Sequence, residues 1–593
     1  MDEHKMTQQE EIREREALFV LYVLAGGIVA VILWVAHSRL YLTNQHLTEL
    51  AARPLLAIAF AIAVLRYFAT RQLRREEQWP RTAPVIAPSA DRKYLAEAAA
   101  RDAVLIGYRT NGSPFYWTNQ LRSMQAICFG QTGAGKSTLL ESVTQQDIAR
   151  GCPIIIIDGK GEQKLLQSLL PAIRTAGRMH QLRLIDPQNS EYSAFYNPLW
   201  VPDGVSPEDQ VSFIFDSFKM NTNEFFDSHQ RVYLENLVRI LYYSGRRFNM
   251  HDILVVAYDV SVLKHQVQVA MANMARLATS PEERRALAMS VRNLAATFED
   301  KERVPKIQGL INHLMTFMTK EMARITGAYE NVVTMDEVID ERLILYLSLN
   351  TNINTTAITS LGRILLQNLQ LMIGRRYSKS GYETVHPFVS VIMDEFAPFA
   401  YQEFAQIINQ ARGTNVAFLF ALQNQSQLLQ VGESFRSDLS SSPNTTFMLR
   451  IKDDDTAKMF LDASSRVKEM RRSVQFATKG LFAPRYEEQN AGTQTEVYDT
   501  AAKDEHLKRM PTGQMEALVT DHQRGTILEH IHIRQAFQGF LKEDPAAAFY
   551  PPLAVCRKQS QGLHLTFSEM PSQLTDTRTK RTTRRNSSLG GLR

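Results

Sequence analysis

Residues 124–138 read MQAICFGQTGAGKST, and this stretch decides the fold. Its first half is a short apolar run typical of a buried strand, and its second half holds the pattern GxxxxGK[ST] over residues 130–137. A helical pattern follows over residues 138–149. A strand, a glycine-rich loop and a helix in this order predict a loop whose backbone N–H groups surround phosphates at a helix N-terminus.

The side chains of this loop have distinct expected roles. Lys136 would neutralise the β and γ phosphates of a nucleoside triphosphate, and the hydroxyl of Ser137 would bind Mg²⁺. We therefore expect ATP and Mg²⁺ as cofactors. The predicted binding segment consists of Gly130, Gln131, Thr132, Gly133, Ala134, Gly135, Lys136, Ser137 and Thr138.

A second apolar strand, residues 388–395 (FVSVIMDE), ends in two adjacent carboxylates. Asp394 is expected to hold the water shell of Mg²⁺, and Glu395 to orient or deprotonate the attacking water. A strand ending in Asp-Glu is a moderate signal by itself. Combined with the phosphate loop, it predicts hydrolysis rather than nucleotide binding alone.

Two more strand ends are candidates for the same site, because parallel strands end at the crevice where ligands bind. Residues 152–158 form an apolar run that ends at Asp158, which would either touch the water shell of the metal or be a solvated turn acid. Residues 416–421 lead to Gln423, which could sense the γ-phosphate or position water.

Phosphoryl transfer also benefits from an arginine placed on the transferred group, often by a neighbouring molecule. Arg412, between a helical stretch and the strand at 416–421, is the candidate. Arg363 and Arg436 compete with it for this role.

The two halves of the site are far apart in the sequence, so a minimal mononucleotide fold does not suffice. Residues 206–330 are almost wholly helical in pattern, and we expect an all-helical domain inserted between residues 101–205 and 331–540 of the nucleotide-binding domain. Six methionines of the insertion could form a docking face, although core packing is favoured: Met271, Met274, Met289, Met315, Met318 and Met322. The predicted class is α/β, with a RecA-like P-loop NTPase core.

Two apolar runs precede this core. Residues 17–36 carry no charge and are long enough to span a bilayer, and residues 50–68 form a second candidate span. The distribution of basic residues places both ends in the cytoplasm. We therefore expect a cytoplasmic N-terminus over residues 1–16, a transmembrane hairpin over 17–75 and a proline-containing linker over 76–100.

Composition limits the remaining possibilities. The 593 residues carry 67 Lys and Arg against 62 Asp and Glu, a net charge of +5, so bulk charge is no argument for nucleic acid binding. Only three cysteines occur, which indicates neither a disulfide framework nor a cysteine-based zinc site. The positive excess lies near the end of residues 541–593, a C-terminal extension expected to be disordered from about residue 560.

The order of these features resembles the type IV secretion coupling proteins of bacterial conjugation, the TraD/TraG group. Besides the two ATPase motifs, the resemblance rests on residues 158–162, 196–199, 422–428 and 444–457. The usual Asp-Pro-Lys-Gly-Glu of that family has Gly159 in place of proline here.

The resemblance implies a homohexameric ATPase in the bacterial inner membrane, with most of the chain in the cytoplasm. It would pass relaxase-bound single- or double-stranded DNA, or protein effectors, to a type IV secretion channel. One alternative is a membrane receptor or scaffold for protein substrates in which nucleotide is only a switch. Another is a DNA pump of the FtsK/HerA kind.

Overall fold

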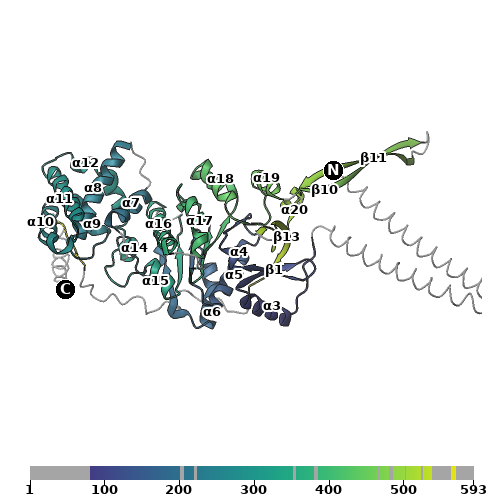
Figure 1. Cartoon of the computed structure of the whole chain (residues 1–593), viewed down its shortest axis with the longest axis horizontal. Coiled ribbons are helices and arrows are strands. Elements are labelled where there is room, and N and C mark those ends of the chain that lie inside the picture. Colours follow the sequence, from purple (N-terminus) through teal and green to yellow (C-terminus); the bar gives the residue numbers. More distant parts are fainter. Residues whose placement is uncertain are drawn as a thin grey trace, which may run out of the picture. The chain divides into compact units, whose positions relative to one another are not determined.

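The computed structural model (Figure 1) describes residues 81–200, 206–218, 224–351, 355–379, 385–464, 466–479, 485–500, 502–521, 525–536 and 562–568. The predicted spans at 17–36 and 50–68, the N-terminus 1–16 and the rest of 17–75 lie outside the described residues. Among the helices that are described, none combines the length and apolar character needed to cross a bilayer.

Eleven strands of the described chain form one mixed sheet. From edge to edge they are β2 (Pro114–Thr118), β1 (Ala103–Arg109), β13 (Gly525–Ile533), β12 (Gln514–Asp521), β9 (Thr445–Met448), β3 (Ala126–Phe129), β8 (Val416–Leu422), β7 (Val389–Asp394), β4 (Ile154–Asp158), β6 (Ile344–Ser348) and β5 (Leu182–Ile185). The seven strands from β9 to β5 are parallel, and the others pair antiparallel. A separate ribbon pairs β10 (Arg466–Lys479) with β11 (Arg485–Thr500).

The central strands β3, β4, β7 and β8 are buried along their whole length, as expected for parallel strands covered on both faces. Their parallel direction brings the carboxyl ends of all four to one edge of the sheet. The antiparallel part joins distant segments, since β1 near the start of the described chain pairs with β13 near its end (Figure 1). Strands β1 and β2 form an antiparallel hairpin.

Between β5 and β6 the described chain contains helices and no strand of the sheet. They are α7 (Pro207–Ser217), α8 (Glu224–Tyr242), α9 (Met250–Tyr258), α10 (Val260–Leu277), α11 (Pro281–Thr297), α12 (Arg303–Lys306), α13 (Gln308–Thr316), α14 (Lys320–Thr326) and α15 (Met335–Asp340). We call α7 to α14 the helical domain.

The methionines of the helical domain differ from expectation. Core packing was the wrong expectation for Met271, Met289 and Met315, which are exposed.

Two boundaries predicted from the sequence were wrong. Residues 88–100, assigned to a linker, form helix α3 (Pro88–Ala100), whose Ala98 belongs to a core cluster with Leu105 and Tyr108 of β1. Pro88 stands near the start of α3, where proline is favoured, so it begins a helix rather than marking a linker. Residues 562–568, assigned to a disordered tail, pack on the helical domain.

Other helices connect the parallel strands. They are α5 (Lys136–Ala149), α6 (Gln163–Thr175), α16 (Thr355–Lys379), α17 (Phe404–Ala411), α18 (Glu433–Ser441) and α19 (Asp454–Ala463). Helix α5 follows β3 through the phosphate loop, so its N-terminus lies at the carboxyl edge of the sheet. Two short helices complete the described chain, α4 (Asn119–Arg122) and α20 (Asp504–Arg509).

Candidate nucleotide site

The loop of residues 130–135 connects β3 with α5 and closes on itself. Gly133 and Gly135 have positive φ angles of 78° and 116°, which glycine adopts without strain. The ammonium of Lys136, at the first position of α5, donates to the carbonyl of Gly130 across the loop. Lys136 is buried, and burial lowers the pKa of its ammonium. The loop therefore holds a desolvated positive charge at a helix N-terminus, an arrangement suited to phosphate.

The acidic pair lies at the same edge of the sheet, one strand away. Strand β8 lies between β3 and β7, and Asp394 at the end of β7 is in register with Ala421 of β8 and Asp158 of β4. Glu395 follows directly and has a φ of 54°. A non-glycine residue in the left-handed region costs conformational energy, and such residues concentrate at functional sites.

Both carboxylate oxygens of Glu395 accept hydrogen bonds from glutamines that follow β8. Nε2 of Gln423 donates to Oε1 at 2.8 Å, and Nε2 of Gln427 donates to Oε2 at 2.9 Å. Gln427 also accepts from the backbone N–H of Gln423 at 2.9 Å, which fixes the two glutamines relative to each other. The structure thus brings the predicted Gln423 to Glu395, and adds Gln427, which the sequence analysis did not select.

Lys160 is the second functional side chain that the sequence analysis missed. Its Nζ lies 3.2 Å from Oδ2 of Asp394 and 3.7 Å from Oε1 of Glu395, so one ammonium bridges the acidic pair. Oδ1 of Asp158 holds this loop by accepting the backbone N–H groups of Lys160 and Gly161, at 3.0 and 3.1 Å.

Steric contacts explain why position 159 is a glycine. Its N–H donates to the carbonyl of Asp394 at 2.9 Å, and a Cβ added there would lie 2.2 Å from the carbonyl oxygen of Glu395. Proline has no N–H to donate and carries a Cβ. In this chain the close approach of the 159–161 loop to the end of β7 therefore requires glycine.

Asp158 is not a solvated turn acid. It is buried, and Oδ2 accepts the hydroxyl of Tyr346 at 2.9 Å while Oδ1 accepts the two loop N–H groups. Burial raises the pKa of Asp158 to about 6, with the charge of Asp394 contributing in the same direction. Asp158 organises the loop that carries Lys160.

The donor set fits Mg²⁺. Oδ1 of Asp394 is buried and has no hydrogen-bond partner among the described residues. Burial raises the pKa of this carboxyl, although Lys160 opposes the shift. An unsatisfied buried carboxylate oxygen costs free energy unless it binds a ligand, and oxygen is the ligand that Mg²⁺ prefers. Ser137 at the start of α5 would supply the second protein oxygen.

The three candidate arginines lie in different surroundings. Arg412 lines a cavity together with Phe388 and Asn415, which precede β7 and β8, so it lies at the amino edge of the sheet. Arg363 is buried and donates to the carbonyl of Ala400 at 3.3 Å. The assignment of Arg412 as an arginine supplied to a neighbouring molecule stays a prediction.

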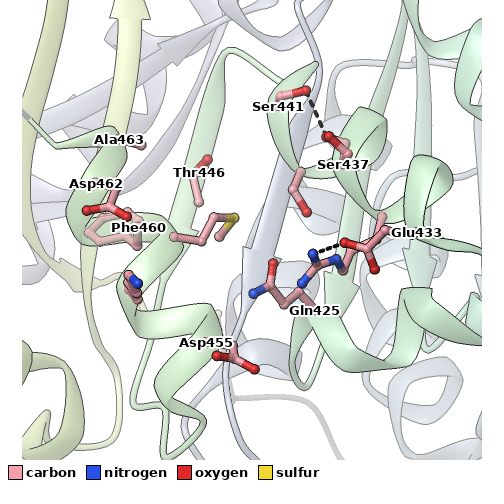
Figure 2. Close-up of a pocket in the computed structure, with 13 residues that line it drawn as sticks. Gln425, Glu433, Ser437, Ser441, Thr446, Asp455, Phe460, Asp462 and Ala463 are labelled. Atoms are coloured by element: carbon pink, nitrogen blue, oxygen red, sulfur yellow. Dashed lines mark hydrogen bonds and ion pairs between the residues drawn. The ribbon is translucent and has the colours of Figure 1, made fainter.

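Arg436 lines a different cavity of ≈ 590 Å³, shown in Figure 2, and pairs with Glu433. Gln425 and Asp455 are among the residues that line that cavity (Figure 2). Lys136, Asp394 and Glu395 are not among its lining residues. This cavity is therefore separate from the candidate nucleotide site.

Similar proteins agree with the resemblance seen in the sequence. The type 4 coupling protein DotL of Legionella pneumophila is 20% identical over 460 residues, which cover 67% of this chain and 57% of DotL. The chain thus matches less than two thirds of the length of that relative.

Solved structures of the conjugative coupling protein TrwB also match. The unbound form has a TM-score of 0.49 at 14% identity, covering 78% of this chain and 95% of TrwB. The complex with ADP and Mg²⁺ has a TM-score of 0.47 at the same identity and coverage.

The family described as "Type IV secretory system Conjugative DNA transfer" has a model that matches residues 89–464. That range includes the phosphate loop, the acidic pair, Lys160, Gln423 and the helical domain. Since the match covers more than half of the 593 residues, the chain belongs to the type IV secretory system conjugative DNA transfer family.

Proposed function

We propose that the protein is an ATP hydrolase that drives a substrate into a type IV secretion channel. One observation carries the proposal. Two patches far apart in the sequence, the phosphate loop and the acidic pair, meet at one edge of the sheet, and the acidic pair has one buried oxygen without a hydrogen-bond partner among the described residues. Buried carboxylate oxygens are usually hydrogen-bonded or bound to a ligand, which supports a ligand at this position.

The residues divide the reaction between them. Lys136 and the loop N–H groups bind the phosphates, and Ser137 and Asp394 would hold Mg²⁺, which neutralises charge on the transferred phosphoryl group. Glu395 accepts a proton from the attacking water.

Gln423 and Gln427 position the catalytic carboxylate. Each donates to a different oxygen of Glu395, so they fix the plane of the carboxylate before water attacks. Lys160 bridges Asp394 and Glu395 and offsets the repulsion between two adjacent negative charges. The two glutamines therefore orient the carboxylate of Glu395, and Lys160 stabilises the two adjacent charges.

The wider function follows from family membership, since the family is described by conjugative DNA transfer. We propose DNA with its relaxase, and protein effectors, as cargo, and channel components as partners. The protein would act as a homohexamer anchored in the bacterial inner membrane by residues 17–36 and 50–68. DNA would be held by contacts to its phosphates with little reading of sequence, so its affinity should fall as salt rises.

Steady-state ATP hydrolysis by the full chain in detergent tests this proposal. We expect DNA to raise the rate, and the rate per protomer to rise with protein concentration as a ring assembles. Lys136→Ala should abolish both effects without changing the circular dichroism spectrum. Hydrolysis that persists in Lys136→Ala would refute the site assignment, and a rate that is indifferent to DNA would refute DNA as the stimulating cargo.

A further inference from the structure

The segment of residues 562–568, which we call the tail segment, has the pattern of a half-buried strand. Leu563, Leu565 and Phe567 are partly buried, and the alternate residues His564, Thr566 and Ser568 are exposed. The segment is not a regular strand, because His564 has a φ of 50°, in the left-handed region. The N–H of His564 donates to the hydroxyl of Tyr329 at 3.3 Å, so this residue also contacts the helical domain.

The helical domain accepts the backbone of the tail segment along one helix. The N–H of Leu563 donates to the carbonyl of Arg247 at 2.9 Å, that of Leu565 to Oδ1 of Asp252 at 2.9 Å, and that of Ser568 to Oδ2 of Asp259 at 2.8 Å. Asp252 lies in the first turn of α9 and Asp259 directly after its end. Three residues of extended chain span about 10 Å. Seven helical residues span about the same length, so the segment runs beside α9 in register.

We call the surface of the helical domain that contacts the tail segment the groove. Side chains add selectivity at both of its ends. The hydroxyl of Ser568 donates to Asp259 at 2.6 Å, and the ring of Phe567 lies edge-on to Tyr258, with the centroids 6.1 Å apart. At the other end, a Cβ added to Gly562 would lie 2.5 Å from ring atoms of Tyr329. The groove therefore favours a glycine, alternating apolar residues, and an aromatic residue followed by a hydroxyl.

Asp252 receives part of its hydrogen bonding from the tail segment and part from the helical domain, including the hydroxyl of Tyr329. Its carboxylate is buried and already caps α9 through Asn249, and the N–H of Leu565 satisfies its other oxygen. Burial raises the pKa of this carboxyl, and hydrogen bonds oppose the shift. Without a peptide in place, Oδ1 of Asp252 would lose this partner.

We propose that the helical domain carries a binding groove for an extended protein segment, and that the tail segment is its intramolecular ligand, which a partner's segment of the same chemistry must displace. The partner is identified as a protein because the groove accepts hydrogen bonds from four backbone N–H groups, those of Leu563, His564, Leu565 and Ser568. The tail segment thereby regulates access to the helical domain. This inference does not depend on the nucleotide site.

Covalent linkage makes the competition measurable. The intervening residues 537–561 could reach up to about 85 Å if extended, enough to deliver the tail segment to its own domain. A linked ligand has an effective concentration of the order of 1 mM. If the free segment binds at about 0.1 mM, linkage weakens the apparent affinity for a competing peptide by about tenfold.

The test uses a fluorescein-labelled peptide of residues 560–570 and the full chain in detergent. Gly562→Val changes only the tail segment, and its added carbons would collide with Tyr329 and free the groove. We expect the peptide to bind this variant about tenfold more tightly than it binds the wild type. Equal affinity for both proteins, or binding to neither, would overturn the proposal.

A second substitution tests the groove itself. Asp259→Asn keeps the side-chain oxygen that caps α10 but replaces the acceptor of Ser568 with a donor. Combined with Gly562→Val, it should weaken peptide binding about tenfold. The matched control, Asp300→Asn in the same domain, removes a carboxylate that pairs with Lys306 and should leave peptide binding unchanged.

Amide hydrogen exchange provides an independent readout that needs no added peptide. The N–H groups of Leu563, Leu565 and Ser568 should be protected in the wild type and exchange freely in Gly562→Val. Rapid exchange of these three amides in the wild type would contradict the proposal, whatever the peptide titration shows.

Discussion

Two buried charge clusters lie at different places in the nucleotide-binding domain, and they differ in how completely their carboxylates are satisfied. In the first, Asp147 near the end of α5 accepts from both arginines beside it, Arg122 and Arg150. In the second, Lys160 bridges Asp394 and Glu395, yet Oδ1 of Asp394 has no partner among the described residues.

The pKa values of the two aspartates shift in opposite directions. Burial tends to raise both, but the paired arginines outweigh it at Asp147 and lower its pKa to about 2. At Asp394 burial prevails over Lys160, and the pKa is raised. In the first cluster both oxygens of the carboxylate are paired and the ion pair stabilises the fold, although Nε of Arg122 and Nε of Arg150 have no partner among the described residues. In the second cluster one carboxylate oxygen has no partner among those residues. The difference shows how a ligand site can be told from a structural ion cluster with no ligand present.

The largest expected effect is on catalysis at the second cluster. Glu395→Gln should lower ATP turnover by about 10³-fold, because the amide cannot accept a proton from water. Nucleotide binding should persist, since Lys136 and Ser137 are untouched. The control Glu341→Gln, at an exposed residue after α15, should retain wild-type turnover. Turnover above a tenth of the wild-type rate in Glu395→Gln would remove Glu395 from its role.

A substitution in the first cluster should lower the stability of the fold. Asp147→Asn leaves Arg122 buried with a weakened partner, so we expect a loss of about 3 to 5 kcal/mol in the free energy of unfolding, measured in urea. Asp336→Asn, which weakens a half-buried ion pair with Arg375, should cost less, about 1 kcal/mol. Similar losses in the two variants would show that the first cluster is not structural.

Acid should weaken the first cluster in a defined range of pH. The pKa of Asp147 is about 2 in the fold, against an ordinary value of 3.8, so the ionised form stabilises the fold above about pH 4 and this contribution is lost as pH falls toward 2. The stability difference between wild type and Asp147→Asn should shrink by about 2 kcal/mol over that range. A difference that stays constant between pH 4 and 2 would contradict the ion-pair account.

The smallest expected effect concerns the charge balance of the second cluster. Lys160→Met removes the ammonium that offsets Asp394 and Glu395, so Mn²⁺ should bind the nucleotide-free chain about tenfold more tightly, as measured by electron paramagnetic resonance. Lys164→Met, at a mostly exposed lysine nearby, should leave Mn²⁺ affinity unchanged. Equal Mn²⁺ affinity in both variants would mean that Lys160 does not face the metal position.

The sequence analysis selected those candidate residues whose signal is local. The phosphate loop is one continuous motif, and Asp394, Glu395 and Gln423 are recognisable because each follows an apolar strand. The order and register of the strands could not be predicted from the sequence, although the order places β8 between β3 and β7. Sequence analysis therefore selected candidate residues that the fold brings together, without predicting their contacts.

The missed residues share a physical reason. Lys160 and Gln427 act through long side chains that reach from neighbouring loops, and nothing in their local sequence shows what lies opposite. The tail segment was missed because polar composition outweighed a short alternation of apolar residues at 563, 565 and 567. That alternation becomes informative only beside the acceptors of the helical domain.

A structure of the chain with a non-hydrolysable ATP analogue and Mn²⁺ tests the central claim most directly, because Mn²⁺ is located by its anomalous scattering. We predict the triphosphate on the loop of residues 130–137, with the metal between Ser137 and Asp394 and Lys160 moved away from Oδ2 of Asp394. Nucleotide bound elsewhere, or a metal with no direct or water-mediated contact to Asp394, would contradict the account.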